Sequence, residues 1–127
     1  MRDLTKYRLG RATEFLSASK IMLENNFCKD SINRSYYAIF TTIRALLAEK
    51  EIDFKKHSAV IGYFRKIYIK TGIFEVKFSK YIGDAFEIRN NSDYEDFFIV
   101  SEEDAEIQYN HAVEFYEAVK IFLEKSV

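Results

Sequence analysis

The sequence contains no proline and no tryptophan, and only four of its 127 residues are glycine. Proline and glycine most often interrupt helices and form tight turns, so their scarcity disfavours a β-rich fold and favours long helices with short connections. The single cysteine, Cys28, cannot form a disulfide within the chain, and with only two histidines no Cys/His quartet exists for structural zinc. We therefore expect an all-α protein with neither a metal nor a cofactor.

Long apolar runs are also absent. No stretch reaches the length of a membrane span, and the N-terminus has no signal-peptide pattern. Together with the lone cysteine, these absences predict a cytoplasmic protein that does not enter a membrane. Apolar residues still make up 48% of the chain and aromatic residues 17%, which is ample for one hydrophobic core. We expect a single domain over residues 1–127.

Charge is nearly balanced overall but unevenly distributed along the chain. Residues 1–83 carry 16 basic and 8 acidic side chains, whereas residues 84–127 carry 3 basic and 12 acidic ones. Such a division can mark a basic face for nucleic acid, or it can orient parts of a bundle or subunits against one another. The sequence leaves both interpretations open.

Hydrophobic periodicity predicts five helices. The first covers residues 4–25, and the second is capped by Asp30 or Ser31 and reaches Leu47. The third covers residues 58–70 and ends near Gly72, the fourth covers residues 75–90, and the fifth has Ser101 as its N-cap. Short connections make sequential helices antiparallel neighbours, so the expected fold is an antiparallel up-and-down bundle of four to five helices. The residues expected to face inward in the last two helices are Phe78, Ile82, Ala85, Phe86, Ile107, His111, Phe115, Ala118 and Phe122.

The apolar stripe of the fourth predicted helix continues into an arginine. At 100° per residue, Arg89 lies on the same face as Phe78 and Ile82. One interpretation is structural: the arginine extends from a helix end, or it pairs with Asp93. The other is functional: its planar, permanently charged guanidinium binds a phosphate, assisted by the donors that follow it, which are Asn90, Asn91 and Ser92.

A second polar face is predicted on the helix that contains "INRSYYAIF". Tyr37 lies there between Arg34 and Arg44, so this face can receive a phosphate, pack against a partner helix, or simply remain solvated. His57 and His111 lack further residues at metal-ligand spacing, and we interpret both as core or capping residues.

Two stretches together, "INRSYYAIFTTIRALL" at 32–47 and "RNNSDY" at 89–94, with His57 between them, resemble the HEPN (higher eukaryotes and prokaryotes nucleotide-binding) domain family. The resemblance covers nearly the whole chain and is closest to the small stand-alone prokaryotic members. It implies an antiparallel α-bundle, usually a homodimer, often encoded with a minimal nucleotidyltransferase. It also implies that such a pair can act as toxin and antitoxin.

The resemblance is incomplete at the catalytic motif. Ribonuclease members of the family carry an arginine followed after four to six residues by a histidine, and two copies meet in the dimer cleft to cut RNA without metal. Arg89 matches the arginine, but Tyr94 stands in the histidine's place, and Asp96 stands where some toxins carry a modifiable tyrosine. A tyrosine phenol with a pKa of about 10 is ionised in only about one molecule per thousand at pH 7. Without general acid/base help a reaction typically slows by about 10²- to 10⁴-fold.

The sequence therefore supports three hypotheses. The first is a HEPN-type protein that binds a nucleotide or RNA phosphate near Arg89, with contacts from a set of neighbouring residues: Asn90, Asn91, Asp93, Tyr94, Arg34 and Tyr37. The second is a metal-independent ribonuclease toxin in which Arg89 and Tyr94 are catalytic, or in which His57 supplies the missing base. The third is a docking module for the nucleotidyltransferase, with Arg89 and Asp93 as a buried ion pair.

Overall fold

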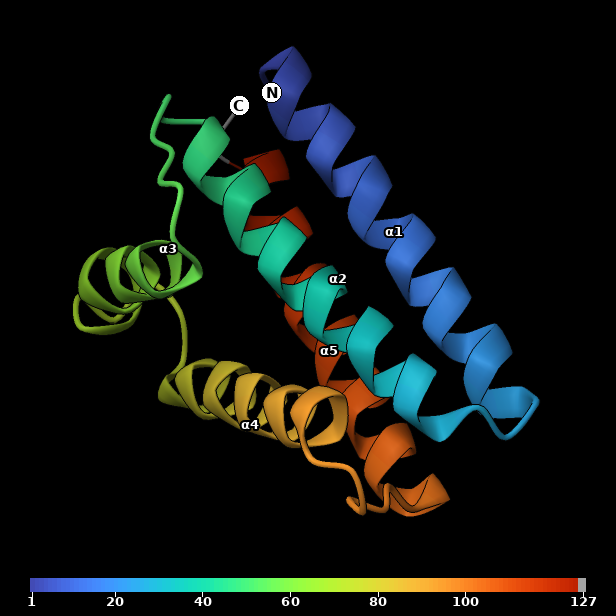
Figure 1. Cartoon of the computed structure of the whole chain (residues 1–127). Coiled ribbons are helices and arrows are strands. Elements are labelled where there is room, and N and C mark those ends of the chain that lie inside the picture. Colours follow the sequence, from blue (N-terminus) through green and yellow to red (C-terminus); the bar gives the residue numbers. More distant parts are fainter. Residues whose placement is uncertain (126–127) are drawn as a thin grey trace.

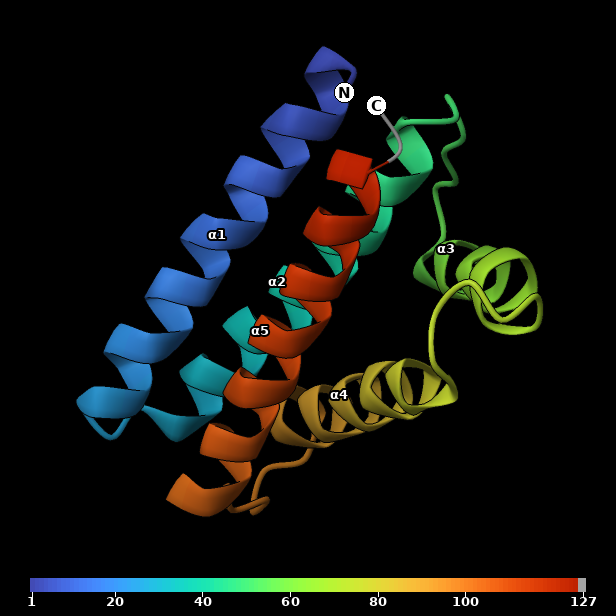
Figure 2. The same cartoon turned by 180° about the vertical axis from the view of Figure 1, so that it is seen from behind.

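A computed structural model describes residues 1–125 as a bundle of five α-helices without any strand in that range. The α-helices are α1 (Asp3–Glu24), α2 (Cys28–Ala48), α3 (His57–Phe64), α4 (Val76–Tyr94) and α5 (Glu102–Lys125), and a π-helical segment, η1 (Arg65–Ile69), continues α3. Figures 1 and 2 show α1, α2 and α5 side by side, with α3 and α4 across one flank of α2. The predicted all-α bundle is confirmed.

Helix α2 is the centre of the molecule. It contacts α1, α3, α4 and α5, and most of its residues are buried. The tight turn after α1, where Asn26 adopts a φ of 65°, makes α1 and α2 an antiparallel pair, as the short connection predicted. In contrast, α5 runs in the same direction as α2 (Figures 1 and 2), because the chain crosses through α3 and α4 before it returns.

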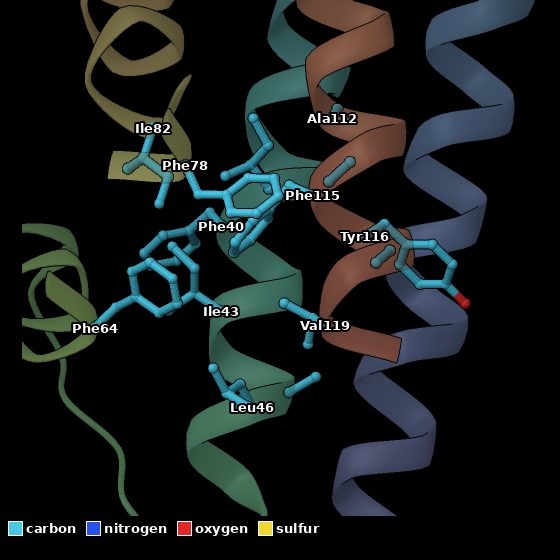
Figure 3. Close-up of a cluster of buried hydrophobic side chains, with 14 of the residues drawn as sticks. Phe40, Ile43, Leu46, Phe64, Phe78, Ile82, Ala112, Phe115, Tyr116 and Val119 are labelled. Atoms are coloured by element: carbon cyan, nitrogen blue, oxygen red, sulfur yellow. The ribbon is translucent and has the colours of Figure 1, made fainter. Parts of the chain in front are cut away.

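The core lies on both sides of α2. Figure 3 shows Phe40, Ile43 and Leu46 between the side chains of α3 and α4 on one side and those of α5 on the other. Four aromatic rings contact one another here at centroid distances of 5.5–6.4 Å: Phe64, Phe74, Phe78 and Phe115. Aromatic pairs prefer such tilted and edge-on contacts, and those of Phe115 hold α3 and α4 against α5.

Two predicted helix boundaries agree with the structure and a third differs. The third predicted helix corresponds to α3 and η1 together, and Gly72 adopts the left-handed φ of 80° that its expected role after a helix requires. Ser101 caps α5 as predicted, since its Oγ accepts a hydrogen bond from the Asp104 backbone N–H at 3.0 Å. The helix predicted to end at residue 90 continues one turn further to Tyr94.

Two predictions about inward-facing residues are wrong. Phe86 is 37% exposed and Ile107 is 40% exposed. Because α5 packs on α2, α1 and α4 at once, its buried strip is offset from the stripe of large apolar residues and includes small and polar side chains. That strip consists of Ala105, Gln108, Ala112, Phe115, Tyr116, Val119 and Leu123.

Candidate functional site

Arg89 points into the protein, in keeping with its place on the apolar stripe. It is only 8% exposed. Its guanidinium carbon lies 4.5 Å from the ring centroid of Tyr36, 5.7 Å from that of Tyr37 and within 5.9 Å of that of Phe86. Cations over aromatic faces at such distances are stabilised by the ring quadrupole. The arginine of α4 is thus seated on a tyrosine pair of α2.

Asp93 holds the other side of this arginine. Its Oδ2 lies 3.5 Å from Arg89 Nη1, one helical turn along α4, and also accepts a 3.4 Å hydrogen bond from Asn33 Nδ2. The side-chain oxygen of Asn33 in turn accepts a 2.7 Å bond from Arg34 Nη1. This (i, i+4) pair is one reason why α4 continues through the polar cluster that was expected to end it.

Tyr36 connects Arg89 to His57. Its hydroxyl lies 2.9 Å from His57 Nδ1, and the imidazole stacks on Phe40 with the ring centroids 3.9 Å apart. Tyr37 meets the same imidazole edge-on, at 6.2 Å. The first residue of α3 is therefore held against α2, and the structure brings together Arg89, Tyr37 and His57, which lie far apart in the sequence.

Burial and nearby charge set the protonation of this cluster. Burial lowers the pKa of His57 below its ordinary value, and the positive charges of Arg89 and Arg44 lower it further. Burial raises the pKa of Tyr36, although the charge of Arg89 opposes that effect. For Arg89, burial acts to lower the pKa, but the two tyrosines and Asp93 outweigh it and the net shift is upward. At neutral pH the site therefore contains a permanent cation on Arg89 beside the neutral imidazole of His57 and the neutral phenol of Tyr36.

One buried polar atom of the arginine lacks a partner. Arg89 Nε is inaccessible and makes no hydrogen bond, and an unpaired buried donor typically costs about 1–3 kcal/mol. An unsatisfied buried donor of this kind can indicate a functional role instead of a stabilising one.

A hollow of about 490 Å³ opens next to His57, at the corner where α2 meets the connection that leads to α3. We name it the corner hollow, and its lining consists of Phe40, Arg44, Asp53, Phe54, Lys55 and His57. Its volume is within the range of about 300–1,000 Å³ that is typical of small-molecule sites. Arg89 does not line it and is connected to it indirectly, through the two tyrosines of α2 and His57.

Four of the residues singled out in the sequence lie away from this cluster. Asn91 lines a separate hollow of about 220 Å³ with residues of α4 and Gln108 of α5. Within the described part of the chain, no hydrogen bond or ring contact connects Asn90 or Tyr94 to Arg89, and Tyr94 is 76% exposed. His111 stacks on Tyr81 of α4 at 3.7 Å and does not join the site.

Sequence reasoning missed Tyr36 as a site residue. Its position on the apolar stripe of α2 assigned it to the core, and it is indeed buried at 1% exposure. The available signal was its hydroxyl, because a buried tyrosine usually requires a hydrogen-bond partner. His57 was the nearest histidine in the sequence that could supply one.

Residues 1–125 contain no group of three or more His, Cys, Asp or Glu side chains that could hold a metal ion. None of the helices in this range has the length and apolar character of a membrane span.

Comparison with known proteins identifies the family. The HEPN domain model matches residues 5–122. A UPF0332 protein of Thermotoga maritima is 32% identical over 121 residues, which are 95% of this chain and 92% of the relative. A protein of Methanocaldococcus jannaschii named "Putative toxin" is 34% identical over 122 residues, covering 96% of this chain and 82% of its own. A second protein of that organism with the same description is 39% identical over 83 residues, 65% of this chain and 62% of its own. The resemblance predicted from the sequence is confirmed, and the chain belongs to the HEPN domain family.

Proposed function

We propose that this protein binds a phosphate group of RNA or of a nucleotide near Arg89. We further propose that it acts as a cytoplasmic homodimer together with a minimal nucleotidyltransferase, in a pair of the toxin–antitoxin type. Membership of the HEPN family and the two toxin-named relatives support the toxin-like part. The phosphate-binding part is carried by one observation: the run of contacts from Asp93 through Arg89 and Tyr36 to His57.

This arrangement suits an anion because it maintains positive charge in a partly desolvated place. Two aromatic faces and one carboxylate already hold Arg89, so its charge is fixed in position before a ligand arrives. Arg34 and Tyr37 border the same cluster from α2 and can contact a ligand directly. Asn90 and Asn91 remain proposed donors from the end of α4.

The test is a labelled mixed-sequence RNA incubated with purified protein in EDTA, with retention and cleavage measured separately. Arg89→Met removes the charge while it keeps an unbranched side chain against the rings, and Arg11→Met is the matched control on α1. We expect retention by the wild type and by the control, and loss of retention in Arg89→Met. If folded wild type does not retain the RNA, the phosphate-binding proposal is wrong and the docking-module hypothesis is favoured.

Dimerisation is tested independently. Light scattering should give a mass near twice 15.0 kDa at micromolar concentration. A monomer would contradict a ligand site that is shared between two copies. Co-purification with a minimal nucleotidyltransferase would test the proposed partnership.

A second candidate function is metal-independent ribonuclease activity, which the 2.9 Å contact between Tyr36 and His57 favours. In this reaction the 2′-oxygen of RNA attacks the adjacent phosphorus and the bond from phosphorus to O5′ breaks. The products are a 2′,3′-cyclic phosphate and a 5′-hydroxyl. His57 takes the 2′ proton, and the leaving O5′ takes a proton from the imidazolium or from water.

The two candidate bases can be separated. If His57 is the base, His57→Asn should lower cleavage by about 10²-fold or more, whereas Tyr94→Phe should leave it unchanged. If Tyr94 is the base, the two results are exchanged. Detection of a cyclic phosphate end identifies the reaction in either case.

A further inference from the structure

We propose that the corner hollow, rather than the surface at the end of α4, is the place where the nucleotide unit binds: its phosphate contacts Arg44 and Lys55, and its base stacks on Phe54. This inference rests on the proposed function and deepens it. A free nucleotide and one nucleotide of an RNA chain share the chemistry that the hollow would recognise.

Arg89 is too deeply buried to be the main contact of the phosphate. With 8% of its surface exposed, and with the rings of Tyr36 and Tyr37 and the carboxylate of Asp93 around it, Arg89 offers little surface to a phosphate. Its effect on a ligand is therefore exerted mainly through its charge and through the contacts that position His57. In this arrangement Arg89 is a positioning residue.

The lining of the corner hollow carries excess positive charge. Asp53 is its one carboxylate, and it is shared by two arginines, with Oδ2 lying 3.0 Å from Arg44 Nη2 and 3.2 Å from Arg8 Nη2. Burial acts to raise the pKa of Asp53, but the hydrogen bond from Arg44 and further donors outweigh it and lower the pKa, so the carboxylate stays ionised at neutral pH. Arg8 lies outside the lining. Within the lining Asp53 balances Arg44, and Lys55 leaves one net positive charge. The hollow therefore favours an anion.

An aromatic platform stands beside those charges. Phe54 is 38% exposed, and its ring contacts that of Tyr63 at a centroid distance of 5.6 Å, with the two planes tilted by 46°. The backbone N–H of Phe54 donates to Asp53 Oδ1 at 2.9 Å, which restrains this part of the connection between α2 and α3. Proteins bind unpaired bases by stacking them on such exposed rings next to basic side chains.

His57 completes the site with a neutral polar group. Because its Nδ1 is engaged by the hydroxyl of Tyr36, Nε2 is the ring nitrogen available to a ligand. A neutral imidazole can hydrogen bond to a ribose hydroxyl without repelling or attracting the phosphate. Cation, aromatic ring and neutral imidazole thus match the phosphate, base and ribose of one nucleotide.

The experiment measures RNA retention and 5′-AMP binding by the full chain, using variants at the hollow and away from it. Phe54→Ala removes the platform and Lys55→Gln removes one cation. Lys66→Gln is the charge-matched control, because Lys66 is exposed on η1 and lies outside the hollow. Asn90→Ala tests the end of α4. Melting temperatures confirm that each variant is folded.

We expect Phe54→Ala to weaken binding at least fivefold, as loss of one stacked base does, with 5′-AMP binding better than ribose 5-phosphate. Lys55→Gln should reduce the slope of log affinity against log salt by about 0.7, the value for one phosphate contact with a single strand. Lys66→Gln should change neither, and Asn90→Ala should weaken binding less than Phe54→Ala does. If wild type binds but only Asn90→Ala weakens it, the corner hollow is not the site, although phosphate binding by the protein stands. If folded wild type binds neither RNA nor 5′-AMP, both proposals fail.

Discussion

Replacement of Arg89 by methionine or by alanine should have unequal effects on stability. Both substitutions remove the (i, i+4) pair with Asp93, which as a partly exposed pair contributes only about 0.3–0.5 kcal/mol. Both also remove a cation over Tyr36, worth about 1–2 kcal/mol in a desolvated place. Against these losses, both eliminate the unpaired buried Nε, which relieves about 1–3 kcal/mol. These electrostatic effects nearly cancel, so packing decides the outcome.

Methionine keeps most of the buried volume and can place its sulfur against the aromatic rings, whereas alanine leaves a void between Tyr36 and Phe86. We therefore expect Arg89→Met to stay within about 1 kcal/mol of wild type, and Arg89→Ala to lose about 2 kcal/mol or more. For a chain of this length, 1 kcal/mol shifts the melting temperature by roughly 3–5 °C.

The assay is urea unfolding followed by circular dichroism at 222 nm, with equal m-values required for a valid comparison. Equal large losses in both variants would refute this reasoning, because they would show that the positive charge itself stabilises the fold. In that case the docking-module hypothesis, with Arg89 and Asp93 as a structural ion pair, would gain support.

Three further predictions concern the surroundings of the site and the packing of α1 on α2. Tyr36→Phe should cost about 0.5–1.5 kcal/mol in urea unfolding, since it removes the bond to His57, and the cost should vanish in the background of His57→Phe. Burial lowers the pKa of both His57 and His111 in the folded state, so the stability that the neutral imidazoles contribute should be complete above about pH 6.5 and should fall as the pH decreases from 6.5 towards 5. His111→Gln should reduce the slope of this fall, and an unchanged slope would contradict the role assigned to His111. Ser19→Ala should cost about 1–3 kcal/mol, because the Ser19 hydroxyl bonds at 2.7–3.0 Å to two buried serines of α2, whereas the exposed control Ser17→Ala should be neutral by the same assay.

The fold could be predicted from the sequence because its signal is local. Turn residues and helical periodicity located the helices, and Ser101 and Gly72 marked termini through their own backbone and side-chain chemistry. The exposure of Phe86 and Ile107 could not be predicted in the same way. Periodicity indicates which face of a helix is apolar, but the crossing of α4 and α5 over neighbouring helices determines which part of that face is covered.

The candidate site was only half predictable for a related reason. Arg89 stood out because a charge on an apolar stripe requires a partner, and its inward direction is confirmed. Asn90 and Asn91 were grouped with it because they are adjacent in sequence, but successive residues on a helix point about 100° apart, and Asn91 lines another hollow. The partners that the fold supplies come from other helices: Tyr36 from α2 and His57 from α3.

The contrast between neighbours in the sequence and partners supplied by other helices matters for the missing histidine of the family motif. A catalytic group is defined by where its atoms lie, so a histidine from another helix can serve if the fold delivers it to the arginine. Here α3 begins at His57, and the imidazole of His57 contacts Tyr36 and Phe40. The guanidinium of Arg89 lies over the ring of the same Tyr36. An apolar core could have filled this volume without an unpaired buried nitrogen. The proposed ligand site accounts for an arginine, a tyrosine and an imidazole beside a positively charged hollow, whereas the alternative is a purely structural role; the comparison of Arg89→Met with Arg89→Ala separates these two explanations.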